Sequence, residues 1–244
     1  MVEDALGRAP TLIYCAGGNN RFAQIAIEAG YRYGARLPDT VYHPLYFADQ
    51  DWKHPRRDKY MQGLAQHRPH MATVLDWERE DQLAEVLDWA EEAAQFVDQV
   101  VIVPKVPGGI PRLPLQIGPA TVVLGYSVPT KYGGTPLPLW AFAGRPVHLL
   151  GGSPHAQMEC WRYLTPIAEV VSVDGNLHHK IACRACAFWV PGTGHQLYGH
   201  VHNRYWPTLR EANRGTPVDG TDLPYKAFRR SCANIKQAWQ ELCQ

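Results

Sequence analysis

The chain has 244 residues, of which 45% are hydrophobic, and its formal net charge is +1 at pH 7. A chain of this size can bury one large core, and a charge so near zero gives no whole-molecule field that would attract nucleic acid. The sequence has no run of about 18 apolar residues and no basic-then-apolar leader, and its six cysteines are too few for a disulfide scaffold. We therefore expect a reduced cytoplasmic protein with no membrane partner.

Eight short apolar runs recur along the chain, and each ends in a cluster of Gly, Asp, Asn or Pro. They are rich in Val, Leu, Ile, Tyr and Ala without clean polar alternation, which is typical of strands buried on both faces. The runs span residues 11–16, 33–37, 45–48, 71–75, 99–103, 121–125, 147–150 and 169–173. We predict an α/β fold of the (β/α)8 TIM-barrel type, with an open doubly wound sheet as the alternative. The whole chain, 1–244, is interpreted as one domain, with the barrel over about 10–191 and a helical C-terminal extension over about 192–244.

Helix signals occur between several of these runs. Four local signals each indicate one helix: an Asn cap followed later by a glycine that ends the helix, an amphipathic pattern, a Ser-Pro start, and a final stripe of apolar residues. In chain order they predict helices over 21–29, over 79–96, from Ser153 and Pro154 onward, and over 224–242. The connections 37–45 and 104–119 are too short or too rich in proline for a helix. We expect irregular crossovers there, which is where barrels often place functional loops.

Carboxylates stand at three of the predicted strand ends. Asp49, Asp76 and Asp174 follow the third, fourth and eighth runs, and Asp51 lies close behind the first of them. Barrel enzymes place their catalytic groups at the carboxyl ends of the strands. A single Asp in that place often only caps a helix, but three that face one cavity would be costly unless they were used. The pattern favours displacement at the anomeric carbon of a sugar, with a carboxylate as the nucleophile.

Glycines and one histidine complete the rim. The turn from Gly17 to Asn20 predicts either a phosphate site at a helix N-terminus or an ordinary glycine-rich turn. His148 lies inside the seventh run, and we interpret it as a core histidine rather than a catalyst. A metal-dependent hydrolase is disfavoured because the first strand lacks the His-x-His pair that amidohydrolase barrels generally carry.

The order of the motifs at the strand ends carries a resemblance. The motifs are Phe47-Ala48-Asp49, Val74-Leu75-Asp76-Trp77-Glu78, Val123-Leu124-Gly125-Tyr126, Leu149-Leu150-Gly151-Gly152-Ser153-Pro154 and Ser172-Val173-Asp174. This ordered set, over about residues 45–180, resembles the queuine and archaeosine tRNA-guanine transglycosylase superfamily. It is most similar to the compact DNA-modifying members of the DpdA type found in phages.

The resemblance implies a TIM barrel that exchanges guanine in DNA for a 7-deazaguanine base such as preQ0. Asp174 would attack C1′ and form a covalent glycosyl-enzyme intermediate, and Asp49 or Asp51 would act as acid and base on the purine nitrogens. The residues that would contact the base are Asp76, Trp77, Gly125, Tyr126, Gly151 and Gly152. Among them, the Asp76 carboxylate would accept hydrogen bonds from N1 and N2 of guanine, and Trp77 or Tyr126 would stack on its ring. The target nucleotide would have to leave its helical stack to reach such a pocket.

Partners and metals follow from weaker signals. A basic loop with interleaved aromatic residues favours DNA, although a solvated face has the same composition. Its expected contacts, with one lysine from a later strand end, are Lys53, Arg56, Arg57 and Lys105. The short chain leaves no room for the tRNA-binding extension of the larger relatives, which also favours DNA. A homodimer is a further possibility. A nucleoside or glycoside hydrolase and a non-catalytic nucleic-acid-binding barrel are the alternative functions.

No cofactor is required by this chemistry, but a structural zinc is one interpretation of Cys183 and Cys186. The related transglycosylases hold zinc with three cysteines and a histidine, and only the Cys-x-x-Cys half is present here. A tetrahedral zinc site would need two further ligands. The candidates for these ligands are Cys160, His178, His179, His195, His200 and His202. The alternative is that the two cysteines lie on a helix that begins near Asn176 and pack beneath Ala187 and Trp189.

Overall fold

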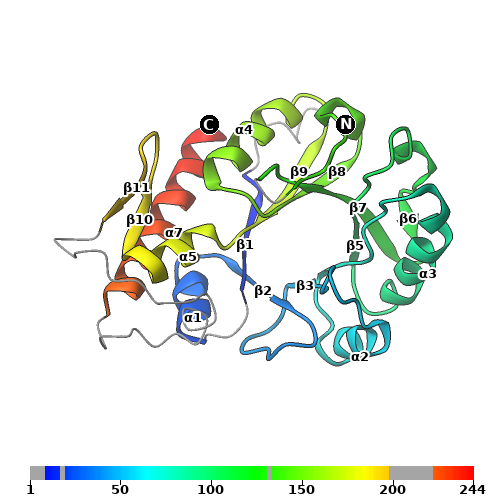
Figure 1. Cartoon of the computed structure of the whole chain (residues 1–244), viewed down its shortest axis with the longest axis horizontal. Helices are drawn as coiled ribbons and strands as arrows, with labels where there is room; N and C mark the ends of the chain where they lie inside the picture. Colours follow the sequence, from blue (N-terminus) through cyan, green and yellow to red (C-terminus); the bar gives the residue numbers. More distant parts are fainter. Residues whose placement is uncertain (1–8, 17–19, 131–132, 198–221) are drawn as a thin grey trace.

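A closed barrel of parallel strands forms the body of the protein (Figure 1). The computed structural model describes residues 9–16, 20–130, 133–197 and 222–244. Within them, eight parallel strands pair in the order β1-β2-β3-β4-β5-β7-β8-β9, and the barrel closes because β9 pairs with β1 and β5 pairs with β7. The strands are β1 Thr11–Cys15, β2 Arg32–Arg36, β3 Phe47–Asp49, β4 Met71–Thr73, β5 Gln99–Ile102, β7 Ala120–Ser127, β8 Pro146–Leu150 and β9 Glu169–Asp174. The predicted TIM-type barrel is confirmed.

Four helices occupy regular positions outside the barrel. They are α1 Asn20–Glu28, α2 Arg57–His67, α3 Leu83–Ala93 and α4 Pro154–Leu164. The start of α4 is as predicted, because the hydroxyl of Ser153 accepts a hydrogen bond from the backbone N–H of Ala156. The sequence analysis assigned the start of α2 to a basic loop, and this was wrong. Only a narrow face of α2, with Tyr60, Met61 and Leu64, is buried, so its sequence lacks a broad apolar stripe.

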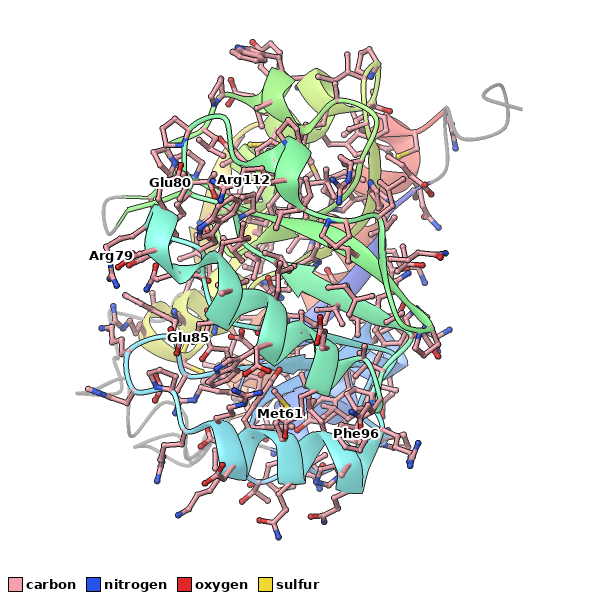
Figure 2. The ribbon with its side chains drawn as sticks, turned by 90° about the vertical axis from the view of Figure 1, so that its right-hand side faces the viewer. Met61, Arg79, Glu80, Glu85, Phe96 and Arg112 are labelled. Atoms are coloured by element: carbon pink, nitrogen blue, oxygen red, sulfur yellow. The ribbon has the colours of Figure 1, made fainter. Side chains whose placement is uncertain are left out.

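The remaining crossovers are irregular. Residues 37–45 contain no helix, and residues 104–119 contain a short 3-10 helix, Ile110–Arg112, and the edge strand β6, Gln116–Ile117. The irregular form of both connections was predicted. The connection from β7 to β8 also holds only a 3-10 helix, Leu139–Phe142. Another 3-10 turn, Glu80–Gln82, precedes α3, and Figure 2 shows its Glu80 beside Arg112, with which it forms an ion pair.

The chain after the barrel packs against its first helix. After β9 come α5 Leu177–Ala185, the antiparallel hairpin of β10 Ala187–Val190 and β11 Gly194–Leu197, and the long helix α7 Leu223–Leu242. In Figure 1 α7 lies beside α5 and β10, and it also contacts α1. Its buried face, which includes Phe228, Ile235 and Trp239, confirms the predicted terminal helix. Within the described part of the chain, no helix has both the length and the apolar character needed to cross a bilayer.

The interior of the barrel sets the floor of the site. A compact apolar cluster, which includes Ile13, Phe47, Met71 and Val101, fills the lumen separately from the larger core between strands and helices. Gly125 belongs to this packing, because a Cβ there would lie 2.7 Å from the side chains of Leu150 and Val103. The polar side chains at the carboxyl ends of the strands therefore stand above a mostly apolar plug, which also holds the buried His148 and Ser172, and face one rim.

Candidate active site

A cavity of about 500 Å³ opens at the carboxyl ends of the barrel strands. Asp49 at the end of β3, Asp76 after β4 and Asp174 at the end of β9 all contribute to its wall. The predicted convergence of the three carboxylates is therefore found in the structure. The volume is in the range of pockets that enclose small ligands, roughly 300–1,000 Å³.

The carboxyl group of Asp49 has a pKa close to neutral pH. Burial raises the pKa of its carboxyl to about 7, and the negative charge of Asp174 adds to this rise. A smaller opposing effect comes from Thr73, whose hydroxyl donates a hydrogen bond of 2.9 Å to Asp49 Oδ1. A carboxyl group with a pKa near 7 can both give and take a proton at physiological pH, as general acid–base catalysis requires.

Asp174 is held by the neighbouring strand end. The backbone N–H of Gly151 donates a hydrogen bond of 3.0 Å to Asp174 Oδ1. Gly151 has a φ of +65°, a left-handed conformation that glycine adopts without strain. From α4, the Gln157 amide donates both to the carbonyl of Gly151, at 2.7 Å, and to the carbonyl of Asp174, at 2.6 Å. These hydrogen bonds join the ends of β8 and β9, and they fix the backbone that carries the Asp174 carboxylate.

Asp76 forms an ion pair across the cavity wall. Lys105 Nζ lies 2.7 Å from Asp76 Oδ2 and 2.8 Å from Glu78 Oε1. Burial raises the pKa of Asp76, and the hydrogen bond and charge of Lys105 oppose that rise. Lys105 was expected to contact nucleic acid, but in the structure it pairs with two carboxylates, and its charge helps Asp76 to remain an acceptor.

Two predicted stacking residues are misplaced. Trp77 is completely buried, and its indole N–H donates to the carbonyl of Arg79. Tyr126 is also buried and packs edge-to-face against Phe142. Neighbouring side chains of an extended backbone point to opposite faces. In β7, Gly125 faces the lumen, so Tyr126 lies on the outer face. Beyond the end of β4, Trp77 forms a β-bridge with Pro104, and its ring lies in the outer core, away from the cavity that Asp76 lines.

Asp51 and Gly125 also lie away from the cavity wall. Asp51 sits in a smaller polar hollow on the other side of Gln50, where Arg36 Nη1 lies 3.6 Å from Asp51 Oδ2. Gly125 lies below the cavity, where it leaves room for the packing of the lumen. Of the two candidate acid–base groups, the structure brings only Asp49 to Asp174. Gly151 and Gly152 do line the cavity, as predicted.

The basic residues divide into two groups. Arg57 is held by α3, because its guanidinium forms ion pairs with Asp88 at 2.5 Å and with Glu92 at 2.7 Å. It therefore fastens α2 to α3, and its charge is paired with carboxylates of the protein itself; the expected contact of Arg57 with nucleic acid stays a prediction. Lys53 and Arg56 lie in the exposed loop between β3 and α2. Lys53 follows Trp52, a residue of the cavity wall, whereas Arg56 lines a smaller hollow that also contains Asp51.

Two further residues line the cavity wall: Trp52, an aromatic residue of the basic loop that the sequence analysis noted without assigning it to the site, and Gln50, which the sequence analysis missed. Trp52 follows Asp51 in that same loop, lines the cavity and is 62% exposed, so its ring is accessible for stacking. Gln50 is buried, and its Oε1 has no hydrogen-bond partner among the described residues. A buried acceptor without a partner at a cavity wall is a feature expected of a ligand contact. The position of Trp52 in a basic loop is a sequence signal for nucleic-acid binding, whereas no sequence signal identifies Gln50.

Among the residues that the structure describes, no further zinc ligands join Cys183 and Cys186. Cys183 is buried on α5, as the alternative interpretation predicted. Cys186 was expected on the same helix, but it is also buried and lies just past the helix end, with a φ of +48°. Among the described residues, no three His, Cys, Asp or Glu side chains are grouped to hold a metal ion. His200 and His202 lie outside the described residues, as do residues 17–19 of the predicted phosphate-binding turn. The described donors do not fit a tetrahedral zinc, and no role for the metal is derived.

Comparison with known proteins places the chain in a family. The family described as "Family of unknown function (DUF6610)" matches residues 24–240. The chain belongs to the DUF6610 family. The matched range of this DUF6610 protein includes all three cavity carboxylates. A search of curated proteins returns no match. Among solved structures, the chain is similar to mutually generated monomers of a dimeric phosphoribosylanthranilate isomerase from Thermotoga maritima. The two share 12% identity over 68% of this chain and 87% of that chain, with a TM-score of 0.36.

Proposed function

We propose that this DUF6610 protein is a DNA-guanine transglycosylase that exchanges guanine in DNA for a 7-deazaguanine base. One observation carries the proposal: Asp49, Asp76 and Asp174 line a single cavity at the catalytic end of a TIM-type barrel. Their environments differ, because Asp49 has a pKa near 7 while Asp174 is fixed by a backbone N–H. Carboxylates in different environments can divide the roles of acid and nucleophile between them.

The first step would release guanine. Asp174 attacks C1′ of the target nucleotide, and the bond between C1′ and N9 breaks as the ester bond to the carboxylate forms. The electron pair of the broken bond passes to the purine, which takes the proton of the neutral Asp49 carboxyl. The second step reverses this order with the 7-deazaguanine. Asp49 removes the proton from the nitrogen that attacks C1′, and the carboxylate of Asp174 leaves.

Asp76 would select the base. An ionised carboxylate has acceptor sites on both oxygens, so Asp76 can keep its contact with Lys105 and still accept the N1 and N2 donors of guanine. Adenine carries an acceptor at N1 and would leave a buried oxygen unpaired, which costs about 1–3 kcal/mol. Gly151 and Gly152 line the cavity without projecting side chains, so a flat ring can lie against their backbone.

The loop after β3 would hold the nucleic acid. A base inside a duplex cannot reach a barrel cavity, so the nucleotide must turn out of its stack. Trp52 lies at the cavity wall, and the ammonium group of Lys53 lies 5.1 Å from the centre of its ring. An aromatic face next to exposed cations is how proteins hold single-stranded nucleic acid. DNA is therefore the macromolecular partner that we propose.

An exchange assay tests the proposal. The wild-type protein is incubated with a guanine-containing oligodeoxynucleotide and radiolabelled preQ0 or guanine. We expect label to enter the DNA in equal amount to the guanine released. Release of guanine without entry of label would identify the hydrolase instead. DNA binding without release would identify a non-catalytic nucleic-acid-binding barrel.

Substitution of Trp52 by alanine should weaken substrate binding. Stacking of one base on an aromatic side chain contributes about 1–3 kcal/mol, so KM for the oligonucleotide should rise by about tenfold or more. Trp140→Ala is the matched control, because Trp140 is 73% exposed but does not line the cavity. We expect steady-state kinetics to show an unchanged KM for this control. Equal values of KM for the two variants would contradict the assignment of Trp52.

A further inference from the structure

His148 lies within the lumen of the barrel, next to the proposed nucleophile. Its side chain comes from the middle of β8 and is completely buried, with its ring 5.0 Å from that of Phe47. Its Nε2 lies 3.5 Å from Asp174 Oδ1 and has no hydrogen-bond partner among the described residues. A buried polar atom without a partner is rare in folded proteins, and beside a catalytic group it points to a functional role.

The hydrogen bond of the other ring nitrogen, Nδ1, determines which nitrogen of His148 carries the proton. His148 Nδ1 lies 2.7 Å from the hydroxyl oxygen of Ser172 on β9, and that hydroxyl also lies 3.7 Å from the sulfur of Met71. An imidazole nitrogen is a much stronger acceptor than a thioether, so the Ser172 hydroxyl donates to Nδ1. In the neutral ring the proton then resides on Nε2, on the side of Asp174. The Asp174 carboxylate favours the same tautomer, because its Oδ1 is an acceptor and Nε2, which lies opposite it, must then be the donor.

We propose that His148 is a positioning residue for Asp174, which it restrains by donating its Nε2–H to Oδ1. This inference rests on the proposed function and deepens it. The backbone N–H of Gly151 already binds the same oxygen at 3.0 Å. Two donors on Oδ1 leave Oδ2 as the oxygen that attacks C1′. The distance of 3.5 Å is longer than a hydrogen bond, and catalytic contacts of this kind shorten when substrate binds.

The arrangement also assists the second half of the exchange. When the incoming base displaces Asp174, the bond between C1′ and Oδ2 breaks and its electron pair returns to the carboxylate. A donor already aimed at Oδ1 stabilises that returning charge without any rearrangement of the site. Ser172 in turn fixes the donor, since it holds the tautomer and the plane of the ring.

Two amide variants separate the roles of the two ring nitrogens. In His148→Gln the amide nitrogen reaches the position of Nε2 and keeps the donor toward Asp174. In His148→Asn the amide reaches only the position of Nδ1, where its oxygen can accept the hydrogen bond from Ser172, and the donor toward Asp174 is lost. In single-turnover exchange we expect the Asn variant to be slower than wild type by about a hundredfold at unchanged KM. The Gln variant should stay within about tenfold of wild type, because it keeps the donor.

The kinetic comparison is interpreted only where the wild type exchanges bases and both variants melt at similar temperatures. Equal rates for the Asn and Gln variants would then overturn the inference, whereas an inactive wild type would overturn the proposed function. A second measurement holds in either case. In ¹⁵N-histidine NMR of the wild type, we expect His148 Nε2 to carry the proton and its signal to move in Asp174→Ala. An unprotonated Nε2 would overturn the inference.

Discussion

If the proposed function is right, Asp174→Asn should abolish base exchange, with an expected fall in kcat/KM of at least about 10⁴-fold, as is found when an enzyme loses its nucleophile. The amide is close to the carboxylate in shape, and its oxygen can still accept the hydrogen bond from Gly151. It is a very poor nucleophile, however, so no ester bond to C1′ forms. The measurement is the entry of labelled preQ0 or guanine into an oligodeoxynucleotide.

A control for Asp174→Asn is Asp51→Asn. Asp51 carries the same functional group near the same rim, but it pairs with Arg36 in a separate hollow. We expect its exchange rate to remain close to that of wild type, and both variants to bind the oligonucleotide. Undiminished exchange in Asp174→Asn would reject Asp174 as the nucleophile. A large loss in Asp51→Asn would return Asp51 to the catalytic group.

Asp49→Asn should lose activity and gain stability. Removal of a general acid and base costs about 10²–10⁴-fold in rate. Because the neutral carboxyl must protonate the leaving guanine, wild-type kcat/KM should fall as the pH rises through about 7, the pKa of Asp49 in the folded protein. The residual activity of the Asn variant should lack this dependence. A wild-type profile that is flat from pH 6 to 8 would contradict the role given to Asp49.

The gain in stability follows from the same pKa. The folded protein raises the pKa of Asp49 from 3.8 to about 7, so between these values the folded state binds a proton that the unfolded chain releases. The wild type should therefore lose stability as the pH rises from about 4 to 7, and carry the full penalty above 7. Each pKa unit corresponds to about 1.4 kcal/mol, so Asp49→Asn should be more stable than wild type at pH 8 by up to ~4 kcal/mol.

Urea unfolding at pH 5 and pH 8 measures this difference in the free energy of unfolding. The advantage of the Asn variant should be about two to three times larger at pH 8 than at pH 5. An advantage that is equal at the two pH values, or larger at pH 5, would show that Asp49 is ionised at little cost in the folded protein.

The barrel and the three carboxylates could be predicted because both depend on local patterns. Apolar runs that lack alternation require burial on both faces, and the carboxyl ends of parallel strands must meet at one rim. Asp49, Asp76 and Asp174 were found on that basis alone. The position of Tyr126 could also have been deduced. It is adjacent to Gly125, which faces the lumen, and the alternation of a strand then turns it outward.

Other features depend on contacts between distant parts of the chain. The helix α2 is mostly polar, and Arg57 joins it to α3 through Asp88 and Glu92, which lie 31 and 35 residues away. His148 has the sequence context of an ordinary core histidine. Its unpaired nitrogen meets Asp174 only because β8 and β9 are neighbours in the sheet. The exposure of Trp52 likewise depends on a loop whose path the sequence does not determine.

The central claim is that Asp174 forms a covalent bond to the sugar during base exchange. Intact-protein mass spectrometry, after an acid quench of wild-type protein turning over a guanine-containing oligodeoxynucleotide, tests it directly. We predict an adduct with the mass of the protein plus the oligonucleotide without its guanine, mapped by proteolysis to the peptide that contains Asp174, and absent from Asp174→Asn. Exchange or guanine release with no adduct in the wild type, or an adduct on a different peptide, would contradict the account.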